Sequence, residues 1–225
     1  MTKSIRTKAI VLRRTNYGEA DRILQFLTPD GRYSALARGV RREKSRLAGG
    51  IELFAICDIV ITQGKGDLGI VTSARLITFF RHILEDYDRL QFAYEAVKQI
   101  ARASETVDEP EWFMVLSEIL GALDDKAVPL RLVETWFYLR YADLLGHGLN
   151  LQRDVTGSQL AAEKNYTYDV SEQGLREAVS GDITVDHIKL LRLVGAKPLS
   201  VLKQIGGIEA ILPVCLLTTR QHAAI

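Results

Sequence analysis

The sequence predicts an α+β protein in which a small β-barrel domain, residues 1–79, precedes an all-helical domain, residues 80–225. Two observations indicate this division. Short β-rich runs, separated by turns that contain glycine or proline, fill the first part of the chain. From about residue 79 onward the apolar residues recur at intervals of three and four instead, which is the spacing of a helix. A chain of 225 residues is long enough for either one large domain or two small ones.

Five strands are predicted in the first domain. The runs "KAIVLRR" and "DRILQFLT" lie on either side of the turn-like "TNYGEA", and "YSALA" follows the turn "TPDGRY". Proline presets φ and glycine accepts positive φ, so "TPDGRY" predicts a hairpin between the second and third strands. The fourth and fifth strands, "LFAICDIVITQ" and "IVTSARLI", are joined by the glycine-rich turn "GKGDLG".

The number and spacing of these strands predict a closed or nearly closed barrel. Five strands in about 75 residues, with a longer insertion after the third, suit the five-stranded oligonucleotide-binding (OB) barrel. An SH3-like barrel is the alternative, and hydrophobic periodicity does not separate the two.

Five helices are predicted in the second domain. The first carries the stripe Ile83, Tyr87, Leu90, Tyr94, Val97 and Ile100. The others follow over 108–123, 129–145, 184–195 and 208–220, and Pro213 is a candidate kink in the last. Residues 149–171 are predicted to form a loop with one short extended piece, "NYTYDV".

The formal net charge of +1 conceals a strong asymmetry. Residues 1–80 contain 14 Lys and Arg against 7 Asp and Glu, a net charge of +7, whereas residues 81–225 contain 15 against 21, a net charge of −6. A basic domain joined to an acidic one indicates an anionic partner for the first, and nucleic acid is the leading candidate.

The segment "RGVRREKSRLAGG", residues 38–50, concentrates this positive charge after the third strand. Like charges so close together repel unless an anion neutralises them, and arginine offers forked donors for phosphate oxygens. The two glycines are expected to keep the segment mobile. The predicted phosphate contacts are Arg38, Arg41, Arg42, Lys44 and Arg46, with Arg14 and Lys65 as weaker additions. Tyr17 and Tyr33 are candidates either for base stacking or for packing within the barrel.

The sequence does not favour an enzyme, a metal protein or a membrane protein. The segment "GKGDLG" is followed by a strand rather than the helix that a dinucleotide fingerprint needs. The four histidines, His82, His147, His187 and His222, lack metal-ligand spacing, and there is no nucleophile elbow or P-loop. Cys57 and Cys215 are expected to be buried thiols in a reducing cytoplasm. Charged residues interrupt every apolar run before it reaches the length of a membrane span, so no membrane partner is expected.

The first 80 residues resemble the N-terminal domain of the bacterial recombination mediator family RecO. The resemblance rests on the order of several pieces: a first strand, an acidic turn ending in Asp21-Arg22, a second strand, the turn "TPDG", the motif "ARGVR" and a basic Ser-Arg loop. It implies an OB barrel followed by a helical domain and a cytoplasmic, nucleoid-associated location. It also implies binding of single- and double-stranded DNA, annealing of complementary strands, and loading of RecA onto single strands coated by single-stranded-DNA-binding protein, together with RecR.

The chain departs from this family at one site. Many members carry zinc on two C-x-x-C pairs in the helical domain. Here Arg153 and Thr156 stand where the first pair is expected, and the second pair, after "YDVSEQG", is absent. Residues 149–178 therefore form a degenerate, cysteine-free version of the zinc-binding region, and no zinc is expected there.

The resemblance also implies capture of the acidic C-terminal tail of single-stranded-DNA-binding protein. Such a tail needs an apolar groove with a few cations at its edge. The candidate cations lie on two predicted helices: Arg131, Arg140, Lys189 and Arg192. Two other functions stay open from the residues alone, an RNA-binding barrel and a protein–protein adaptor with a helical peptide-binding domain.

Overall fold

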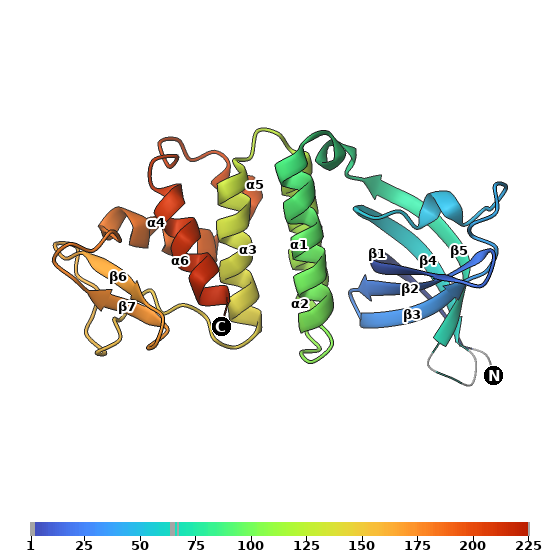
Figure 1. The fold of residues 1–225 in the computed structure, drawn as a ribbon, viewed down its shortest axis with the longest axis horizontal. Helices are drawn as coiled ribbons and strands as arrows, with labels where there is room; N and C mark the ends of the chain where they lie inside the picture. The colour runs from blue at the N-terminus through green and yellow to red at the C-terminus, as the bar shows by residue number, and fades with distance from the viewer. Residues whose placement is uncertain (1–2, 64–65, 67, 225) are drawn as a thin grey trace. The chain divides into compact units, whose positions relative to one another are not determined.

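The structure is a computed structural model, and it describes residues 3–63, 66 and 68–224. The chain divides into two compact units, Met1–Asp124 and Asp125–Ile225 (Figure 1). The predicted division at residues 79 and 80 falls inside the first unit, because the two helices after the barrel pack with its strands.

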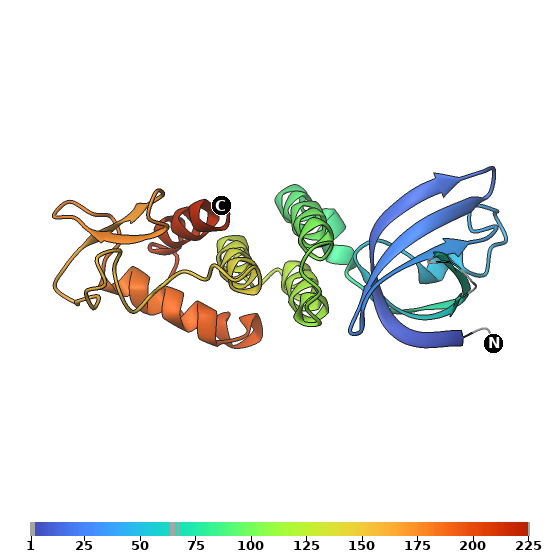
Figure 2. The ribbon, with the colours of Figure 1, turned by 90° about the horizontal axis from the view of Figure 1, so that it is seen from below.

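The first unit begins with a closed barrel of five strands: β1 (Lys3–Tyr17), β2 (Asp21–Thr28), β3 (Gly31–Ala37), β4 (Ala55–Gln63) and β5 (Leu68–Phe79). Their order around the barrel is β1-β2-β3-β5-β4, and β1 closes the ring by pairing with β4 (Figure 2). β3 and β5 are parallel, while the other neighbours are antiparallel. The predicted OB barrel is therefore confirmed.

The barrel interior is filled by the alternate residues of these strands. The side chains of Leu24, Phe26 and Ile59 are fully buried in one apolar cluster. The turn predicted in "TPDGRY" is also confirmed, since Thr28 pairs with Gly31 across it and Gly31 has a φ of 104°. β4 and β5 form the second predicted hairpin, whose tip residues 64, 65 and 67 lie outside the described residues.

The seam between β3 and β5 is closed only partly by strand pairing. These strands pair over residues 34–36 and 68–70, and the segment after β3 packs against the barrel beyond that point. Val40 and Ile51 are 4% and 1% exposed and belong to the barrel core, with Leu47 and Ala48 partly buried beside them. The basic segment is thus anchored by apolar residues, which the sequence did not lead us to expect.

The short 3₁₀ helix η1 (Ala48–Gly50) lies directly on β5. Gly50 is buried, and a Cβ added there would lie under 3.0 Å from the carbonyl oxygen of Ala74. The expectation that the glycines keep this segment mobile is therefore wrong at Gly50. Glycine is needed at that position because it allows two backbones to approach closely.

Two helices complete the first unit, α1 (Tyr87–Ala103) and α2 (Glu111–Asp124), which lie side by side in Figures 1 and 2. The helix predicted from about residue 79 starts later, because η2 (Arg81–Glu85) is a 3₁₀ turn and Asp86 caps α1. The Asp86 side chain accepts hydrogen bonds from the backbone N–H groups of Asp88 and Arg89.

The buried face of α1 differs from the predicted stripe. Tyr87 and Tyr94 are 74% and 49% exposed, whereas Arg89 is buried. The Arg89 guanidinium donates hydrogen bonds to the carbonyl oxygens of Ala122 and Leu123, where α2 ends. A buried cation can take a position on the packed face because the unpaired carbonyls of a helix C-terminus satisfy it.

The second unit contains α3 (Leu130–Leu144), α4 (Val185–Ala196), α5 (Leu199–Leu202) and α6 (Leu212–Ala223). The last helix starts at Leu212 rather than at residue 208, and Pro213 occupies its first turn instead of kinking it. No helix within residues 3–63, 66 and 68–224 has the length and apolar character needed to cross a bilayer.

This unit is not entirely helical, because a two-stranded sheet of β6 (Tyr166–Asp169) and β7 (Gly174–Glu177) lies between α3 and α4 in the sequence. β6 coincides with the extended piece predicted in "NYTYDV". Tyr166, Leu175 and Ile183 form a small buried cluster with Ile188 of α4, so the hairpin shares a core with a helix.

The two cysteines are buried and free, as predicted. Burial raises the pKa of the Cys57 thiol to about 11 and that of Cys215 to about 12. Both stay protonated at neutral pH, which makes them poor nucleophiles and poor metal ligands.

A substitution at Gly50 tests the close contact between η1 and β5. We expect Gly50→Ala to lower the free energy of unfolding by about 1–3 kcal/mol, the usual cost of overpacking, because the new Cβ meets backbone atoms of Ala74. Gly49→Ala is the matched control, since nothing lies within 4 Å of a Cβ at Gly49. Urea unfolding followed by circular dichroism measures both variants. Equal losses of stability at the two positions would contradict this account.

Candidate nucleic-acid interface

The basic segment is held at one end of the barrel beside the turn between β1 and β2. The backbone N–H of Arg41 donates to the carbonyl of Ala20 at 2.9 Å, and that of Gly39 donates to Oδ1 of Asp21 at 2.7 Å. The Arg41 guanidinium also donates to the carbonyl of Gly18 at 3.3 Å. These bonds and the apolar anchors hold the segment in a defined conformation.

The cations of this segment point into solvent. All five predicted phosphate ligands are exposed: Arg38, Arg41, Arg42, Lys44 and Arg46. None of them forms an ion pair within the part of the chain that the structure describes. Five positive charges thus lie close together, and no carboxylate among the described residues pairs with them.

Arg14 and Lys65 are the two weaker candidates for phosphate contact. Nη1 of Arg14 lies 3.1 Å from Oε2 of Glu52, so its charge is already paired and its side chain is only 28% exposed. Lys65 lies outside the described residues. Neither adds an observed free cation to the segment.

The two candidate tyrosines differ in how far their side chains are exposed. Tyr17, at the end of β1, is 55% exposed and lies close to the turn that holds the basic segment. Tyr33 is partly buried and packs against the barrel core, so it has a packing role. Tyr17 is the aromatic ring that remains available for stacking on a base.

This arrangement has the chemistry of a surface that binds a phosphate backbone. Forked guanidinium groups match pairs of phosphate oxygens, and a solvent-facing surface lets an irregular strand approach. A nearby exposed tyrosine adds a face on which a base of any identity can stack. Contacts of this kind to the phosphate backbone carry no information on the base sequence.

The cations proposed for the second site are distributed over α3 and α4. Arg131 is exposed, and Nη1 of Arg140 lies 3.9 Å from Oδ2 of Asp143. Nζ of Lys189 is 3.6 Å from Oδ1 of Asp186. Arg192 donates two hydrogen bonds, at 2.9 and 2.7 Å, to the carbonyl of Leu151 and so has a structural role.

The apolar neighbours of these four cations belong to the core. Each of the six is buried: Leu132, Val133, Trp136, Phe137, Ile188 and Leu191. A tail-binding surface on these helices therefore depends on their exposed edges rather than on these side chains.

The rings of His82, His187 and His222 have structural hydrogen bonds, whereas the buried Nε2 atom of His147 has no hydrogen-bond partner among the described residues. His82 lies beside Asp124, with Nδ1 and Oδ2 3.3 Å apart, and His187 forms a capping box with Thr184 at the start of α4. Nε2 of His222 donates to the carbonyl of His147 at 2.6 Å, and burial lowers the pKa of His222. No group of three potential metal ligands occurs among the described residues.

Hydrogen bonds to an aspartate organise the loop in which the first cysteine pair was expected. Arg153 donates from Nη1 to the carbonyl of Gly157 at 2.7 Å. Oδ1 of Asp154 accepts hydrogen bonds from both N–H and Oγ1 of Thr156 and from N–H of Ser158. Guanidinium and hydroxyl groups do not replace thiolates as zinc ligands, so these residues do not fit the metal.

The turn between β6 and β7 is also organised by hydrogen bonds to an aspartate. Oδ1 of Asp169 accepts hydrogen bonds from N–H and Oγ of Ser171 and from N–H of Glu172, while Arg176 donates to Oδ2 at 2.5 Å. The Ser171 hydroxyl and the Arg176 guanidinium hold the pKa of Asp169 well below its usual range. The Thr156 hydroxyl lowers the pKa of Asp154 in the same way.

The sequence interpretation missed one further group of cations. Arg13 on β1 and Lys98 and Arg102 on α1 border an apolar groove within the first unit. They are separated by about 85 residues in the sequence, so no local pattern indicates that they lie close together.

Comparison with known proteins identifies similar chains. Residues 1–80 match the family described as "Recombination protein O N terminal". The chain is 32% identical over 204 residues to "DNA repair protein RecO" of Roseiflexus sp. (strain RS-1), a match that covers 87% of this chain and 71% of that protein.

Two other relatives carry the same name. The chain is 31% identical over 205 residues to the protein of Dehalococcoides mccartyi (strain ATCC BAA-2266 / KCTC 15142 / 195), covering 86% of this chain and 80% of the relative. It is 35% identical over 147 residues to that of Rubrobacter xylanophilus, covering 65% of this chain and 59% of the relative. The similarity therefore extends well beyond the barrel.

The two aspartate-centred loops make the second unit sensitive to acid. A carboxylate whose pKa is lowered in the folded state stabilises the fold above its ordinary pKa of about 4, and this contribution is lost as the pH falls. We therefore expect Asp169→Asn to lower the thermal midpoint at pH 7 and to weaken its decline between about pH 4 and pH 2. Asp186→Asn, which removes an exposed pair with Lys189 and one acid from the first turn of α4, should change both much less. Thermal scans at several pH values give the comparison, and identical behaviour of the two variants would disprove the role of Asp169.

Proposed function

The chain belongs to the RecO family of DNA repair proteins, and we propose that it acts in DNA repair and recombination as a non-enzymatic mediator that binds DNA. The observation that carries this proposal is the anchored basic segment on the OB barrel. Its five exposed cations form no ion pair in the described part of the chain, so their full charge is available to phosphates.

The proposed mechanism of binding is electrostatic. Each cation that contacts a phosphate releases condensed counterions, which favours binding at low salt and weakens it at high salt. Because the segment is already folded, little conformational entropy is lost when a strand binds. Both single- and double-stranded DNA offer the same phosphates, so both are proposed ligands.

Strand annealing follows from the same surface. Two complementary strands repel each other through their phosphates, and this repulsion falls when cations neutralise part of the charge. Strands held close together on one protein then pair by collision. The protein contributes proximity and charge neutralisation, and no covalent chemistry is required of its residues.

Partner binding is the second part of the proposal. By family resemblance, we propose that the protein works with RecR and helps RecA to load onto strands coated by single-stranded-DNA-binding protein. The acidic tail of the latter is proposed to bind along the exposed edges of α3 and α4. Arg131 is the candidate there whose side chain is exposed and has no ion pair among the described residues. The proposed location is the bacterial cytoplasm, at the nucleoid.

The basic segment should determine both DNA affinity and its salt dependence. We expect simultaneous replacement by glutamine of its five cations to weaken binding of a single-stranded oligonucleotide strongly. The slope of log K against log salt should shrink by about 0.7 for each lost phosphate contact. Fluorescence anisotropy at several salt concentrations measures both quantities.

The control for this experiment replaces exposed cations of the second unit, Lys197→Gln with Arg220→Gln, and should leave the slope unchanged. Circular dichroism verifies that each variant folds. An unaltered slope in a folded segment variant would show that the segment is only a solvated surface. Parallel titrations with RNA and duplex DNA test the alternative of an RNA-binding barrel, which tighter binding of RNA would favour.

Charge reversal tests the proposed tail contact. We expect Arg131→Glu with Arg140→Glu, or else Lys189→Glu with Arg192→Glu, to weaken binding of a tail peptide while binding of naked DNA stays unchanged. Because Arg192 also holds the carbonyl of Leu151, Lys189→Glu alone is the cleaner variant for α4. Calorimetry with the peptide measures the affinity. If neither helix affects it, the proposed location is wrong.

A further inference from the structure

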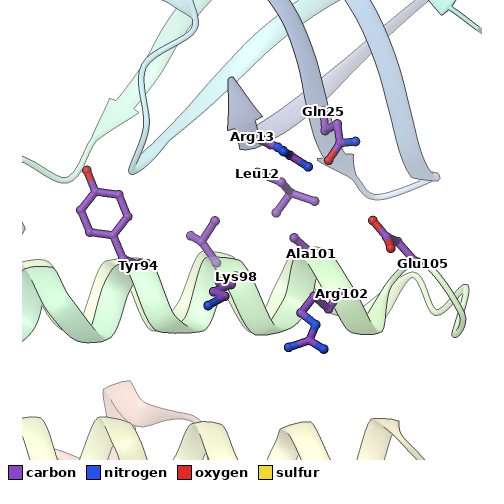
Figure 3. A pocket seen from close by; sticks show the side chains of 9 residues that line it. Leu12, Arg13, Gln25, Tyr94, Lys98, Ala101, Arg102 and Glu105 are labelled. Carbon is purple, nitrogen blue, oxygen red and sulfur yellow. The ribbon is translucent and has the colours of Figure 1, made fainter. Parts of the chain in front are cut away.

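A groove of about 440 Å³ lies between the barrel and α1 in the first unit (Figure 3). Leu12, Arg13 and Gln25 line it from β1 and β2, and α1 supplies the opposite wall. In Figure 3 Leu12 points from the strands toward the helix, above Ala101. The volume falls within the range of sites that bind ligands or peptide side chains.

Local features of both elements create the space. Ala9 and Val11 of β1 face the barrel core, so the alternation of the strand directs Leu12 to the outer face, toward α1. The pairing of β1 with β2 shifts at the same place, between Val11 and Arg13. Val97 and Ala101 lie one helical turn apart on the facing side of α1. Ala101 has a small side chain, which leaves the groove open where a larger residue would fill it.

The exposed surface of the groove is mostly apolar, and Leu12, Val97 and Ala101 are its aliphatic side chains. Leu12 and Val97 are 6% and 5% exposed at its floor. Tyr94 borders one end, and its ring is already packed edge-on against Phe54, with ring centroids 4.9 Å apart. Gln25 supplies the one side-chain amide of the lining.

The rim of the groove carries uncompensated positive charge. Arg13, Lys98 and Arg102 are exposed, and none has an ion pair or side-chain hydrogen bond within the described part of the chain. The only acid of the lining, Glu105, is held by Arg32 at 3.3 Å. In Figure 3 the Arg102 guanidinium points away from the barrel, and its long side chain can turn toward a ligand at the rim.

We propose that this groove binds a short acidic segment of another protein, with one apolar side chain inserted between β1 and α1. The apolar floor would bury that side chain, and the three rim cations would pair with flanking carboxylates. This site is separate from the tail contact proposed on α3 and α4, and it does not depend on DNA binding by the basic segment.

The chemistry of the lining favours a peptide over a nucleic-acid strand. Bases bind through aromatic faces and through several polar groups that read their edges. Here the floor is aliphatic, the nearest aromatic ring already contacts Phe54, and Gln25 alone offers an amide. A Leu or Phe side chain matches such a floor better than a base does.

The test uses the full chain and a fluorescein-labelled peptide amide, Asp-Asp-Glu-Leu-Phe-Asp. We expect it to bind, with affinity about tenfold or more above that of two comparison peptides. One comparison peptide replaces the acids with lysine, and the other replaces Leu-Phe with Ser-Ser. Fluorescence anisotropy measures all three. Equal affinity for the three peptides, or no binding of the acidic apolar peptide, overturns the proposal.

Variants of the groove locate the binding. Ala101→Leu fills the space, and Lys98→Glu with Arg102→Glu reverses the rim charge; each should weaken peptide binding by about tenfold. Gln91→Leu, at an exposed position of α1 outside the groove, and Lys8→Glu, at an exposed position of β1, are the matched controls and should have no effect. Unchanged peptide affinity in folded groove variants overturns the proposal.

A labelled thymidine oligonucleotide, tested with the same variants, separates this proposal from DNA binding. We expect the groove variants to keep most of the affinity for the oligonucleotide, and the variant of the five segment cations to keep its affinity for the peptide. If the groove variants lose oligonucleotide binding as strongly as the segment variant does, the groove is part of the nucleic-acid interface and the proposal is wrong. A failure of DNA binding by the segment would leave the peptide result unaffected.

Discussion

The closure of the barrel seam is the constraint on which the nucleic-acid interface depends. β3 and β5 pair over only three residues each, so another part of the chain must cover the barrel core beyond them. The segment that begins at Arg38 does this with Val40 and Ile51, and Gly50 allows its backbone to contact that of Ala74. The contact that completes the core therefore also fixes the position of the cations.

The basic segment separates its two roles by residue type. Its apolar residues are directed into the barrel, whereas its arginines and lysine are directed into solvent. Hydrophobic burial supplies the stabilisation that offsets repulsion among the cations, since no carboxylate pairs with them in the described residues. A binding surface that is already ordered loses less conformational entropy when it meets its ligand than a mobile loop would.

In the second unit, two aspartates hold loops in a defined conformation. In the loop before β6 and in the turn between β6 and β7, a single carboxylate accepts several hydrogen bonds from its own loop. Charge-assisted hydrogen bonds of this kind can organise a short loop in the way a bound cation organises its ligands. The stabilisation has a different pH dependence from that of a zinc site, because it requires an ionised aspartate rather than a thiolate.

The sequence by itself determined the five strands of a small barrel, the hairpin at "TPDGRY", the start of α3 after Pro129 and the concentration of positive charge after β3. These features depend on residues close together in the chain, where periodicity and turn chemistry act directly. Only the tertiary structure decided that Gly50 serves close packing, that Arg14 and Arg192 are engaged by distant partners, and that β1 and α1 enclose an apolar groove. Each of these depends on contacts between residues far apart in the sequence, and their positions follow from the packing of whole elements.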